Sequence, residues 1–262
     1  MSAPVPTPLA GHHILVTRPP LQALALTALI EAAGGQVMAL PTLDTRPVAP
    51  DTTGRAALDA LPGYDLAIFI SANAVQHARA WAWPWPAAVP AYAVGTATAA
   101  ALRSADVARV CVPVDGADSE ALLRMPALVN AQGKRIVIFR GLGGREVLAR
   151  SLGARGARVD YVECYERFIP PVEPASVIAL CQEGLLHAVC ISSAQGLENL
   201  TQIVGPAGWA CLRALPHFVI HPRIMERARA LGVTEVITCD ASDTAIVNAL
   251  VAHFNPTQLA SQ

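Results

Sequence analysis

The sequence predicts an α/β protein made of two similar domains, each with a parallel sheet. Short, strongly apolar segments alternate with helical segments of about three turns, as in parallel sheets that helices cover on both faces. The 262 residues are 53% hydrophobic and 15% charged, a globular composition with enough length for two domains. The second half of the chain also repeats the first, so that Arg140 aligns with Arg18 and Tyr165 with Leu43, each 122 positions later.

In the first copy of the repeat, apolar runs bounded by turn signals predict strands, and apolar residues at helical spacing predict helices. Leucines and alanines recur at helical spacing from residue 21 onward, and Gly34 and Gly35 are expected to end this helix. Pro41 ends the next strand, and an extended stretch with two prolines follows it. The expected strands are 13–19, 36–43, 64–71, 90–95 and 108–113, and the expected helices are 21–35, 72–82, 96–105 and 118–128.

The second copy shows the same alternation. Its "HAVCISSAQGL" aligns with "LAIFISANAV" of the first copy, and each copy holds three βα-type units. The strand that begins at 157 runs into a second extended stretch with prolines. The expected strands are 134–141, 157–171, 187–193, 217–222 and 235–240, and the expected helices are 143–156, 174–184, 194–204, 223–232 and 242–254.

Two proline-bearing stretches each follow the first βα unit of their copy. If the chain crosses between domains at both, one domain holds the middle segment and the other joins the two ends. The alternative is a single boundary near residue 130, where the segment "NAQGKR" is a weak linker. We favour the crossing model, which predicts a ligand cleft between the domains. Its boundaries are 1–43 with 169–262 for one domain, 48–164 for the other, and 44–47 and 165–168 for the extended linkers.

The charge balance and the cysteines restrict the partners and the location. With 19 Lys and Arg against 20 Asp and Glu, the net charge of -1 gives no broad field that attracts nucleic acid or an anionic membrane. No apolar run approaches the ~18 residues of a membrane span. The six cysteines include no CxxC pair, which favours a reducing cytosol over a disulfide framework. We expect a cytoplasmic monomer that binds neither nucleic acid nor membranes, with disordered ends at 1–11 and 256–262.

Candidate ligand-binding residues directly follow the strands. The carboxyl ends of parallel strands meet at one edge of a sheet, where backbone N–H groups at helix starts can hold anions. Each serine or threonine there also has a simpler role as a helix N-cap, which does not exclude ligand contact. Because the same serine turn occurs in both copies, we expect an anion pocket with two sides. The six turns are Thr17-Arg18, Ser71-Ala72-Asn73, Gly95-Thr96, Arg140-Gly141, Ser192-Ser193 and His221-Pro222-Arg223.

Several other residues have two possible roles. Arg18 and Arg140 each either pair with a neighbouring acid or reach a ligand carboxylate. Tyr165 either packs in the hinge or hydrogen-bonds or protonates a leaving group. "RGLGGRE" is a partial dinucleotide fingerprint that Glu146 breaks.

Two aromatic features have simpler interpretations. The three tryptophans of "WAWPWP" (Trp81–Pro86) are expected to pack on the domain surface in preference to stacking on a ligand. His217 and His221 stand four positions apart across the end of a strand, where helical facing does not apply, so we expect neither to bind a metal.

Several segments, taken in their order and spacing, resemble a known family. They are "VTRP", "ISANAV", "AVGTATA", "KRIVIFRG" with "GGRE", "VECYER" and "HPRI…ARALG…ASDTAIVNAL". Together they resemble uroporphyrinogen-III synthase, the cofactor-free enzyme that cyclises a linear tetrapyrrole on the way to haem, over nearly the whole chain. The resemblance implies two α/β domains joined by two extended crossovers, an active site in the cleft, and no cofactor or metal.

The resemblance also implies a substrate, a reaction and residue roles. The substrate is the octacarboxylate hydroxymethylbilane, which loses its terminal hydroxyl as water and closes through an azafulvene and a spiro intermediate with ring D inverted. A Gly-Pro-Thr turn of some members is replaced by His221-Pro222-Arg223, which makes Arg223 a candidate carboxylate clamp. The matching residues are Tyr165 for the tyrosine that assists hydroxyl departure, Thr96 or Thr98 for a threonine, and Ser71 with Ser192 or Ser193 for the strand-end serines.

Two alternatives to this function belong to other classes. A non-catalytic two-domain binding protein or sensor would close on an anionic metabolite and bind it tightly without turnover. A nicotinamide-dependent enzyme is disfavoured by the broken glycine fingerprint, and a cofactor fluorescence titration would detect it.

Overall fold

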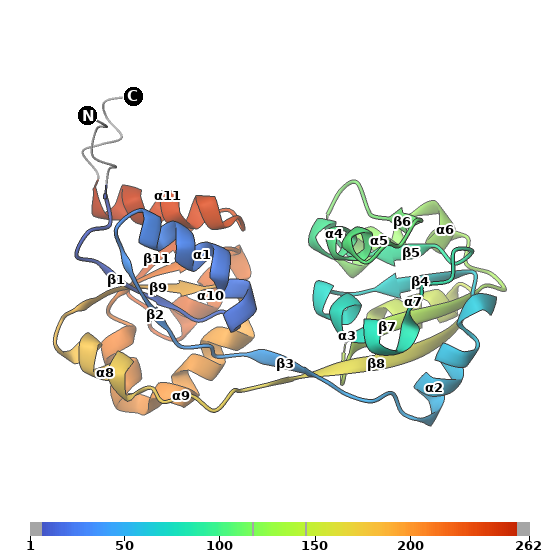
Figure 1. Ribbon diagram of the computed structural model, residues 1–262, viewed down its shortest axis with the longest axis horizontal. Coiled ribbons are helices and arrows are strands. Elements are labelled where there is room, and N and C mark those ends of the chain that lie inside the picture. The colour runs from blue at the N-terminus through green and yellow to red at the C-terminus, as the bar shows by residue number, and fades with distance from the viewer. Residues whose placement is uncertain (1–6, 117, 145, 256–262) are drawn as a thin grey trace. The chain divides into compact units, whose positions relative to one another are not determined.

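The computed structural model describes residues 7–116, 118–144 and 146–255. The chain divides into two compact units, each with its own sheet and core (Figure 1). Unit 1 comprises Met1–Asp44 and Phe168–Gln262, and unit 2 comprises Thr45–Arg167. In the described part of the chain, no helix is long and apolar enough to cross a membrane.

Unit 1 is a five-stranded sheet in the order β11-β10-β9-β1-β2, with all four neighbouring pairs parallel. Successive side chains of a strand point to opposite faces. Ile14 and Val16 therefore pack with α1 and α11, whereas Leu15 packs with α8, α9 and α10. The strands are β1 (His13–Val16), β2 (Gln36–Ala39), β9 (Leu186–Ile191), β10 (Pro216–Val219) and β11 (Glu235–Thr238). The helices are α1 (Pro20–Ala32), α8 (Ala175–Gln182), α9 (Ala194–Leu212), α10 (Pro222–Ala230) and α11 (Asp243–Phe254).

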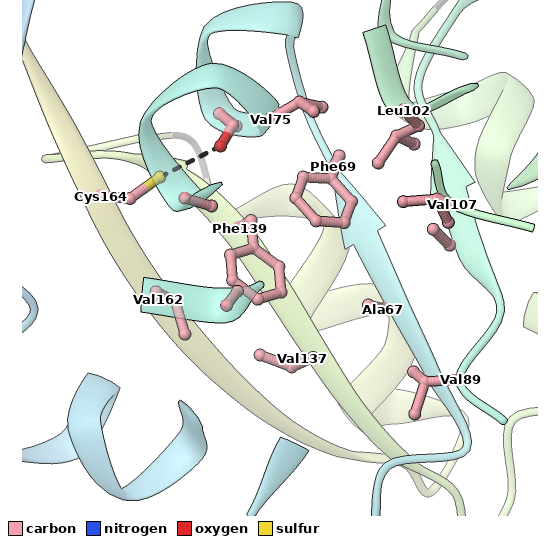
Figure 2. Close-up of a cluster of buried hydrophobic side chains, with 14 of the residues drawn as sticks. Ala67, Phe69, Val75, Val89, Leu102, Val107, Val137, Phe139, Val162 and Cys164 are labelled. Carbon is pink, nitrogen blue, oxygen red and sulfur yellow. Dashed lines mark hydrogen bonds between the residues drawn. The ribbon is translucent and has the colours of Figure 1, made fainter. Parts of the chain in front are cut away.

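Unit 2 is a six-stranded sheet in the order β3-β8-β7-β4-β5-β6, and the pairs from β8 to β6 are parallel. Figure 2 shows one face of it, where Phe69 and Phe139 stack with ring centroids 4.5 Å apart. The strands are β3 (Asp44–Pro47), β4 (Leu66–Phe69), β5 (Ala91–Ala93), β6 (Val110–Cys111), β7 (Arg135–Gly141) and β8 (Arg158–Phe168). The helices are α2 (Thr52–Asp59), the 3-10 helix η1 (Leu61–Gly63), α3 (Ala72–Ala82), α4 (Thr96–Ser104), α5 (Ser119–Leu123), α6 (Pro126–Val129) and α7 (Val147–Ala154).

The strand orders of the two sheets confirm the internal repeat. The order β11-β10-β9-β1-β2 corresponds, strand for strand, to β6-β5-β4-β7-β8. In each unit, the first two strands of one copy lie beside the last three strands of the other copy. The predicted α/β class with two parallel sheets is therefore confirmed.

Some local predictions differ from the structure. Helix α2 was not expected. Its N-cap is Asp51, whose side chain accepts a hydrogen bond from the N–H of Gly54 at 2.7 Å. The helix expected over 118–128 is interrupted before Pro126, which starts α6 because proline suits the first turn of a helix. Residues 44–47, expected as a linker, form β3 beside β8, and residues 165–168 are the end of β8.

The expectation that residues 1–11 are disordered is wrong for residues 7–11. Leu9 is completely buried in the core beneath α1, and its N–H donates to the carbonyl of Ala33 at 2.8 Å. Burying that side chain stabilises the segment by about 2 kcal/mol, which opposes the entropy of the free chain. Residues 1–6 and 256–262, which were also expected to be disordered, lie outside the described residues.

The cysteines, which were expected to favour a reducing cytosol over a disulfide framework, include one bonded pair. Cys181 on α8 and Cys211 on α9 are joined by a disulfide, with Cα atoms 6.2 Å apart. Both side chains belong to the core that α8 and α9 share, so packing brings the sulfur atoms together without a sequence motif. Among the described residues, the four other cysteines are free.

A buried histidine predicts acid-sensitive stability. His217 on β10 is fully buried, its Nδ1 donates to the carbonyl of Leu215 at 2.9 Å, and burial lowers its pKa from 6.5 to about 4. The folded protein therefore favours the neutral imidazole. The contribution of this group to the unfolding free energy should be complete above pH 6.5 and fall by roughly 3 kcal/mol as the pH is lowered toward 4.

Urea unfolding at several pH values checks this prediction in the wild type and in His217→Phe. The phenylalanine keeps an aromatic ring at the site but cannot be protonated. Burial also lowers the pKa of His187, so both proteins should lose stability in acid, and the wild type should lose more. Equal losses in the two proteins would show that His217 does not contribute.

Candidate active site at the carboxyl ends of the strands

Unit 2 brings three of the predicted turns together at one edge of its sheet. Strands β5, β4 and β7 are neighbours and parallel, so the residues that follow them lie at the same edge. Gly95 follows β5, Ser71 follows β4, and Gly141 ends β7. The side chain of Ser71 caps α3 by accepting from the N–H of Ala74 at 3.0 Å.

Unit 1 brings the other three turns together in the matching way. Here β10, β9 and β1 are the neighbouring parallel strands. Ser193 caps α9 by accepting from the N–H of Gly196 at 2.9 Å, and the Nδ1 of His221 accepts from the N–H of Arg223 at 3.1 Å at the start of α10. The role of His221 as a cap was not expected from the sequence.

A β-bulge positions Tyr165 in unit 2. Arg140 pairs with Glu163 in the β7–β8 ladder, but the next residue, Gly141, pairs with Tyr165, so β8 has one extra residue there. As a result, the consecutive residues Cys164 and Tyr165 are both completely buried. Burial also raises the pKa of the Cys164 thiol to about 12, so the thiol stays protonated and acts as a small packed side chain.

The phenol ring of Tyr165 is held by three contacts within unit 2. It packs so closely on Gly141 that a Cβ there would lie 2.8 Å from ring atoms Cε2 and Cζ. His77 on α3 stacks on the ring with centroids 5.5 Å apart, and the Nε2 of His77 lies 3.0 Å from the Oγ1 of Thr45. The Tyr165 hydroxyl is 3.0 Å from the Oγ of Ser71. These contacts fix the orientation of the hydroxyl.

A pocket of about 180 Å³ lies beside this tyrosine. It is lined by Ile70, the loop 141–144 and residues 165–167. In the loop, the N–H of Leu142 donates to the carbonyl of Tyr165 at 2.7 Å, which ties the loop to the end of β8. The side chain of Leu142 is 56% exposed, an apolar surface at the pocket wall.

Arg140 is paired with an acid and holds the loop. Its guanidinium contacts Glu163 at 2.9 Å, donates to the carbonyl of Gly144 at 3.0 Å and lies over the ring of Tyr161 at 3.5 Å. Its Nη1, Nη2 and Nε atoms therefore all have partners inside unit 2. Of the two roles predicted for Arg140, the structure shows the ion pair.

Arg18 is engaged in the same way in unit 1. Its Nη1 is 2.5 Å from Oδ1 of Asp243 at the start of α11, and its side chain is only 12% exposed. Arg223 differs, because it is exposed and has no acid partner among the described residues. It lines an open pocket of about 370 Å³ with Ala194 and other residues of α10. Arg223 is thus the arginine of the predicted set that is free to bind an anion.

The two candidate threonines lie in different environments. Thr96, the first residue of α4, is exposed, whereas Thr98 is 3% exposed and packs inside unit 2. Gly95 precedes the helix as its N-cap and has no side chain to occupy the first N–H groups. Thr96 is therefore the threonine that a ligand can reach in this conformation.

The tryptophans pack as expected. Trp83 donates through Nε1 to the carbonyl of Ala105 at 2.8 Å, and Trp85 donates to the carbonyl of Val89 at 2.9 Å. Both rings lie against Phe69 in the core of unit 2. The three rings are partly buried against this core, and Trp81 belongs to helix α3 and not to an extended segment.

Sequence reasoning missed His77, which stacks on Tyr165, and Thr45, which contacts His77. Thr45 lies 32 positions before His77, and Tyr165 lies in the other copy of the repeat, so no local pattern connects the three residues. The signal that was available is the tyrosine itself, because a buried aromatic hydroxyl usually finds a polar partner.

Comparisons with known proteins agree with this description. A family model described as uroporphyrinogen-III synthase HemD matches residues 25–247. The chain is 31% identical over 249 residues to the uroporphyrinogen-III synthase of Escherichia coli (strain K12), covering 90% of this chain and 99% of the relative. The enzyme of the same name from Salmonella typhimurium (strain LT2) is also 31% identical, over 245 residues, with the same coverage.

Two solved structures share the fold. A mutant uroporphyrinogen III synthase from the extremely thermophilic bacterium Thermus thermophilus has a TM-score of 0.61 at 18% identity, covering 91% of this chain and 97% of that chain. The uroporphyrinogen-III synthetase of Helicobacter pylori 26695 also has a TM-score of 0.61, at 13% identity, covering 92% of this chain and 99% of that chain.

Proposed function

Since the chain belongs to the uroporphyrinogen-III synthase family, lyases of tetrapyrrole biosynthesis, we propose that it cyclises hydroxymethylbilane to uroporphyrinogen III. The reaction removes the terminal hydroxyl as water, forms an azafulvene, and closes the ring through a spiro intermediate with ring D inverted. It involves no net oxidation or reduction, which supports the proposal that the enzyme needs no cofactor. We also propose that it acts in the cytoplasm as a monomer.

The observation that carries this proposal is the fixed phenol of Tyr165 at the carboxyl edge of the unit 2 sheet. Its hydroxyl is hydrogen-bonded to Ser71, its ring packs on Gly141, and His77 stacks on the ring. Departure of a hydroxyl group needs a proton, which neutral hydroxyl groups can supply without placing an extra charge beside the substrate. The azafulvene is reactive by itself, so the protein contributes mainly by positioning.

Binding of the octacarboxylate substrate is proposed to use the strand-end turns. Backbone N–H groups at the starts of α3 and α4 can hold carboxylates, as can the N–H groups at the starts of α9 and α10. The residues proposed to form the substrate-binding site, by contact or by positioning, are Arg18, Ser71, Ala72, Asn73, Gly95, Thr96, Thr98, Arg140, Gly141, Ser192, Ser193, His221 and Arg223, with Tyr165 in the chemical step. The acid pairs of Arg18 and Arg140 support positioning roles for these two arginines.

The activity is tested by supplying hydroxymethylbilane, generated in situ by the preceding enzyme, to the purified protein without added cofactor. After oxidation, chromatography separates the type I and type III uroporphyrins. An excess of type III is expected. Type I alone would mean that the bilane closed spontaneously, and tight binding without turnover would favour the binding-protein alternative.

Arg223→Ala is expected to raise KM for hydroxymethylbilane about three- to tenfold and to leave kcat within twofold. The reason is that an exposed arginine without an acid partner contributes a modest, screened attraction to a carboxylate. Steady-state kinetics of type III formation measure both constants. Arg229→Ala, on the same helix, is the control and should keep the wild-type KM. A KM for Arg223→Ala equal to that of this control would remove Arg223 from the binding site.

A further inference from the structure

The position of Tyr165 raises the question of which hydroxyl group reaches the substrate. Tyr165 is completely buried, so no part of its side chain is exposed to a ligand in this conformation. Ser71, its hydrogen-bond partner, is partly exposed and stands directly after β4 at the carboxyl edge of the sheet. Of the two hydrogen-bonded hydroxyl groups, that of Ser71 therefore belongs to the residue that solvent, and hence a ligand, can reach.

Counting donors and acceptors gives the direction of the hydrogen bond. A phenol has one O–H to donate, and in the described chain the Tyr165 hydroxyl has Ser71 as its one partner. If Ser71 were the donor, the buried O–H of Tyr165 would have no acceptor, which costs roughly 1–3 kcal/mol. With Tyr165 as the donor, the O–H of the buried phenol has an acceptor, and the O–H left without one belongs to the partly exposed Ser71.

The same count shows what remains for Ser71. A serine hydroxyl has two acceptor positions and one donor. Its two acceptor positions are filled by the O–H of Tyr165 and the N–H of Ala74. The single O–H of Ser71 therefore has no acceptor within the described chain and is available to a ligand.

We propose that Ser71 is the group that gives its proton to the departing hydroxyl, and that Tyr165 acts through it as a positioning residue that replaces the proton. The proposal rests on the synthase function proposed above. It predicts that the catalytic residue in contact with the substrate is the serine at the start of α3.

The proton and electron balance of this step is complete. The C–O bond of the terminal hydroxymethyl group breaks, its electron pair stays on oxygen, and the proton of Ser71 passes to that oxygen to form water. The proton of Tyr165 passes to Oγ of Ser71. The pyrrole nitrogen supplies the electron pair for the azafulvenium, which releases its N–H proton to solvent to give the azafulvene, and a solvent proton restores the phenol of Tyr165.

The start of α3 favours this transfer. While Ser71 gives up its proton, its oxygen carries partial negative charge, which the N–H of Ala74 and the N-terminal end of the helix stabilise. The stacking of His77 and the contact with Gly141 keep the phenol in line with Ser71.

The proposal is tested by single-turnover rates of type III formation in Ser71→Ala, Ser71→Asn, Tyr165→Phe and the double variant Ser71→Ala/Tyr165→Phe. Ser71→Ala is expected to lower the rate about a hundredfold, as for loss of a general acid. Tyr165→Phe should lower it roughly tenfold, since Ser71 keeps its own proton, and the double variant should match Ser71→Ala within twofold because the two residues act as a unit. A larger loss in Tyr165→Phe than in Ser71→Ala would overturn the proposal.

Ser71→Asn separates proton donation from capping. Asparagine caps a helix as well as serine does, but it has no acidic proton, so this variant should fold normally and lose as much rate as Ser71→Ala. Asp118→Ala removes the cap of α5 in the same unit and should keep the wild-type rate, which controls for loss of an N-cap alone. Wild-type activity in Ser71→Asn would show that the serine serves only as a cap.

Solvent isotope effects give a second readout that a structural role would not change. When the rate is plotted against the fraction of D2O, two moving protons give a curved line and one gives a straight line. We expect a curved plot for the wild type and a straight plot for Tyr165→Phe. A straight plot for the wild type would contradict the two-proton step. If the wild type formed no type III product at all, the proposed function itself would fail.

Discussion

Gly141→Ala is expected to lower the kcat of type III formation about ten- to a hundredfold while the protein remains folded. A Cβ at this position would lie 2.8 Å from the ring of Tyr165, closer than side chains approach each other, so the ring has to move. Its hydroxyl then loses its alignment with Ser71, from which it is 3.0 Å away. A misplacement of about 1 Å near the reacting groups is enough for a loss of this size.

Gly153→Ala is the matched control for this substitution. Gly153 lies in α7 of the same unit, and a Cβ there would meet no atom within 4 Å. Because alanine also favours a helix, this variant should keep the wild-type kcat and be slightly more stable. Urea unfolding of both variants separates effects on folding from effects on the site. A wild-type kcat in Gly141→Ala would show that the position of the Tyr165 ring does not matter for catalysis.

Phe139→Ala is expected to lower the unfolding free energy of the protein by about 3–5 kcal/mol. Phe139 on β7 is completely buried, and its ring stacks on Phe69 with centroids 4.5 Å apart (Figure 2). The ring also lies edge-on to that of Trp85. Alanine leaves a cavity in the centre of that core, since the neighbouring strands are fixed by the ladder and cannot collapse into it. Denaturant unfolding measures the loss.

The control for Phe139→Ala is Leu142→Ala. Leu142 lies three residues later on the loop after β7, and 56% of its surface is exposed, so its truncation should cost less than about 1 kcal/mol. Similar losses in the two variants would show that the aromatic core does not stabilise unit 2 as described.

The sequence was sufficient to predict the parts of the fold that depend on repeated patterns. The alternation of apolar and helical segments predicts parallel sheets, and parallel sheets place Ser71, Gly95 and Gly141 at one edge. The catalytic role of Tyr165 is a prediction from the family resemblance. The matches over most of the chain confirm the family itself.

Features that depend on contacts between distant residues could not be predicted. The bulge that buries Tyr165 arises from the pairing of β7 with β8, and a local pattern does not reveal such a register change. The acid partners of the two arginines are 225 and 23 positions away from them, so the sequence left ion pairing and ligand binding equally open. The disulfide between Cys181 and Cys211 could not be predicted either, because the packing of α8 on α9 brings the two residues together.

The most direct test of the site is to map it with the product. Amide NMR spectra of the 15N-labelled protein, recorded without oxygen as uroporphyrinogen III is added, report which backbone N–H groups change environment. The amides of 71–73, 95–96 and 141–144, at the carboxyl ends of β4, β5 and β7, should shift most. Shifts concentrated at 63–65 and 133–134, at the amino ends of β4 and β7, would contradict the placement of the active site at the carboxyl edge of the sheet.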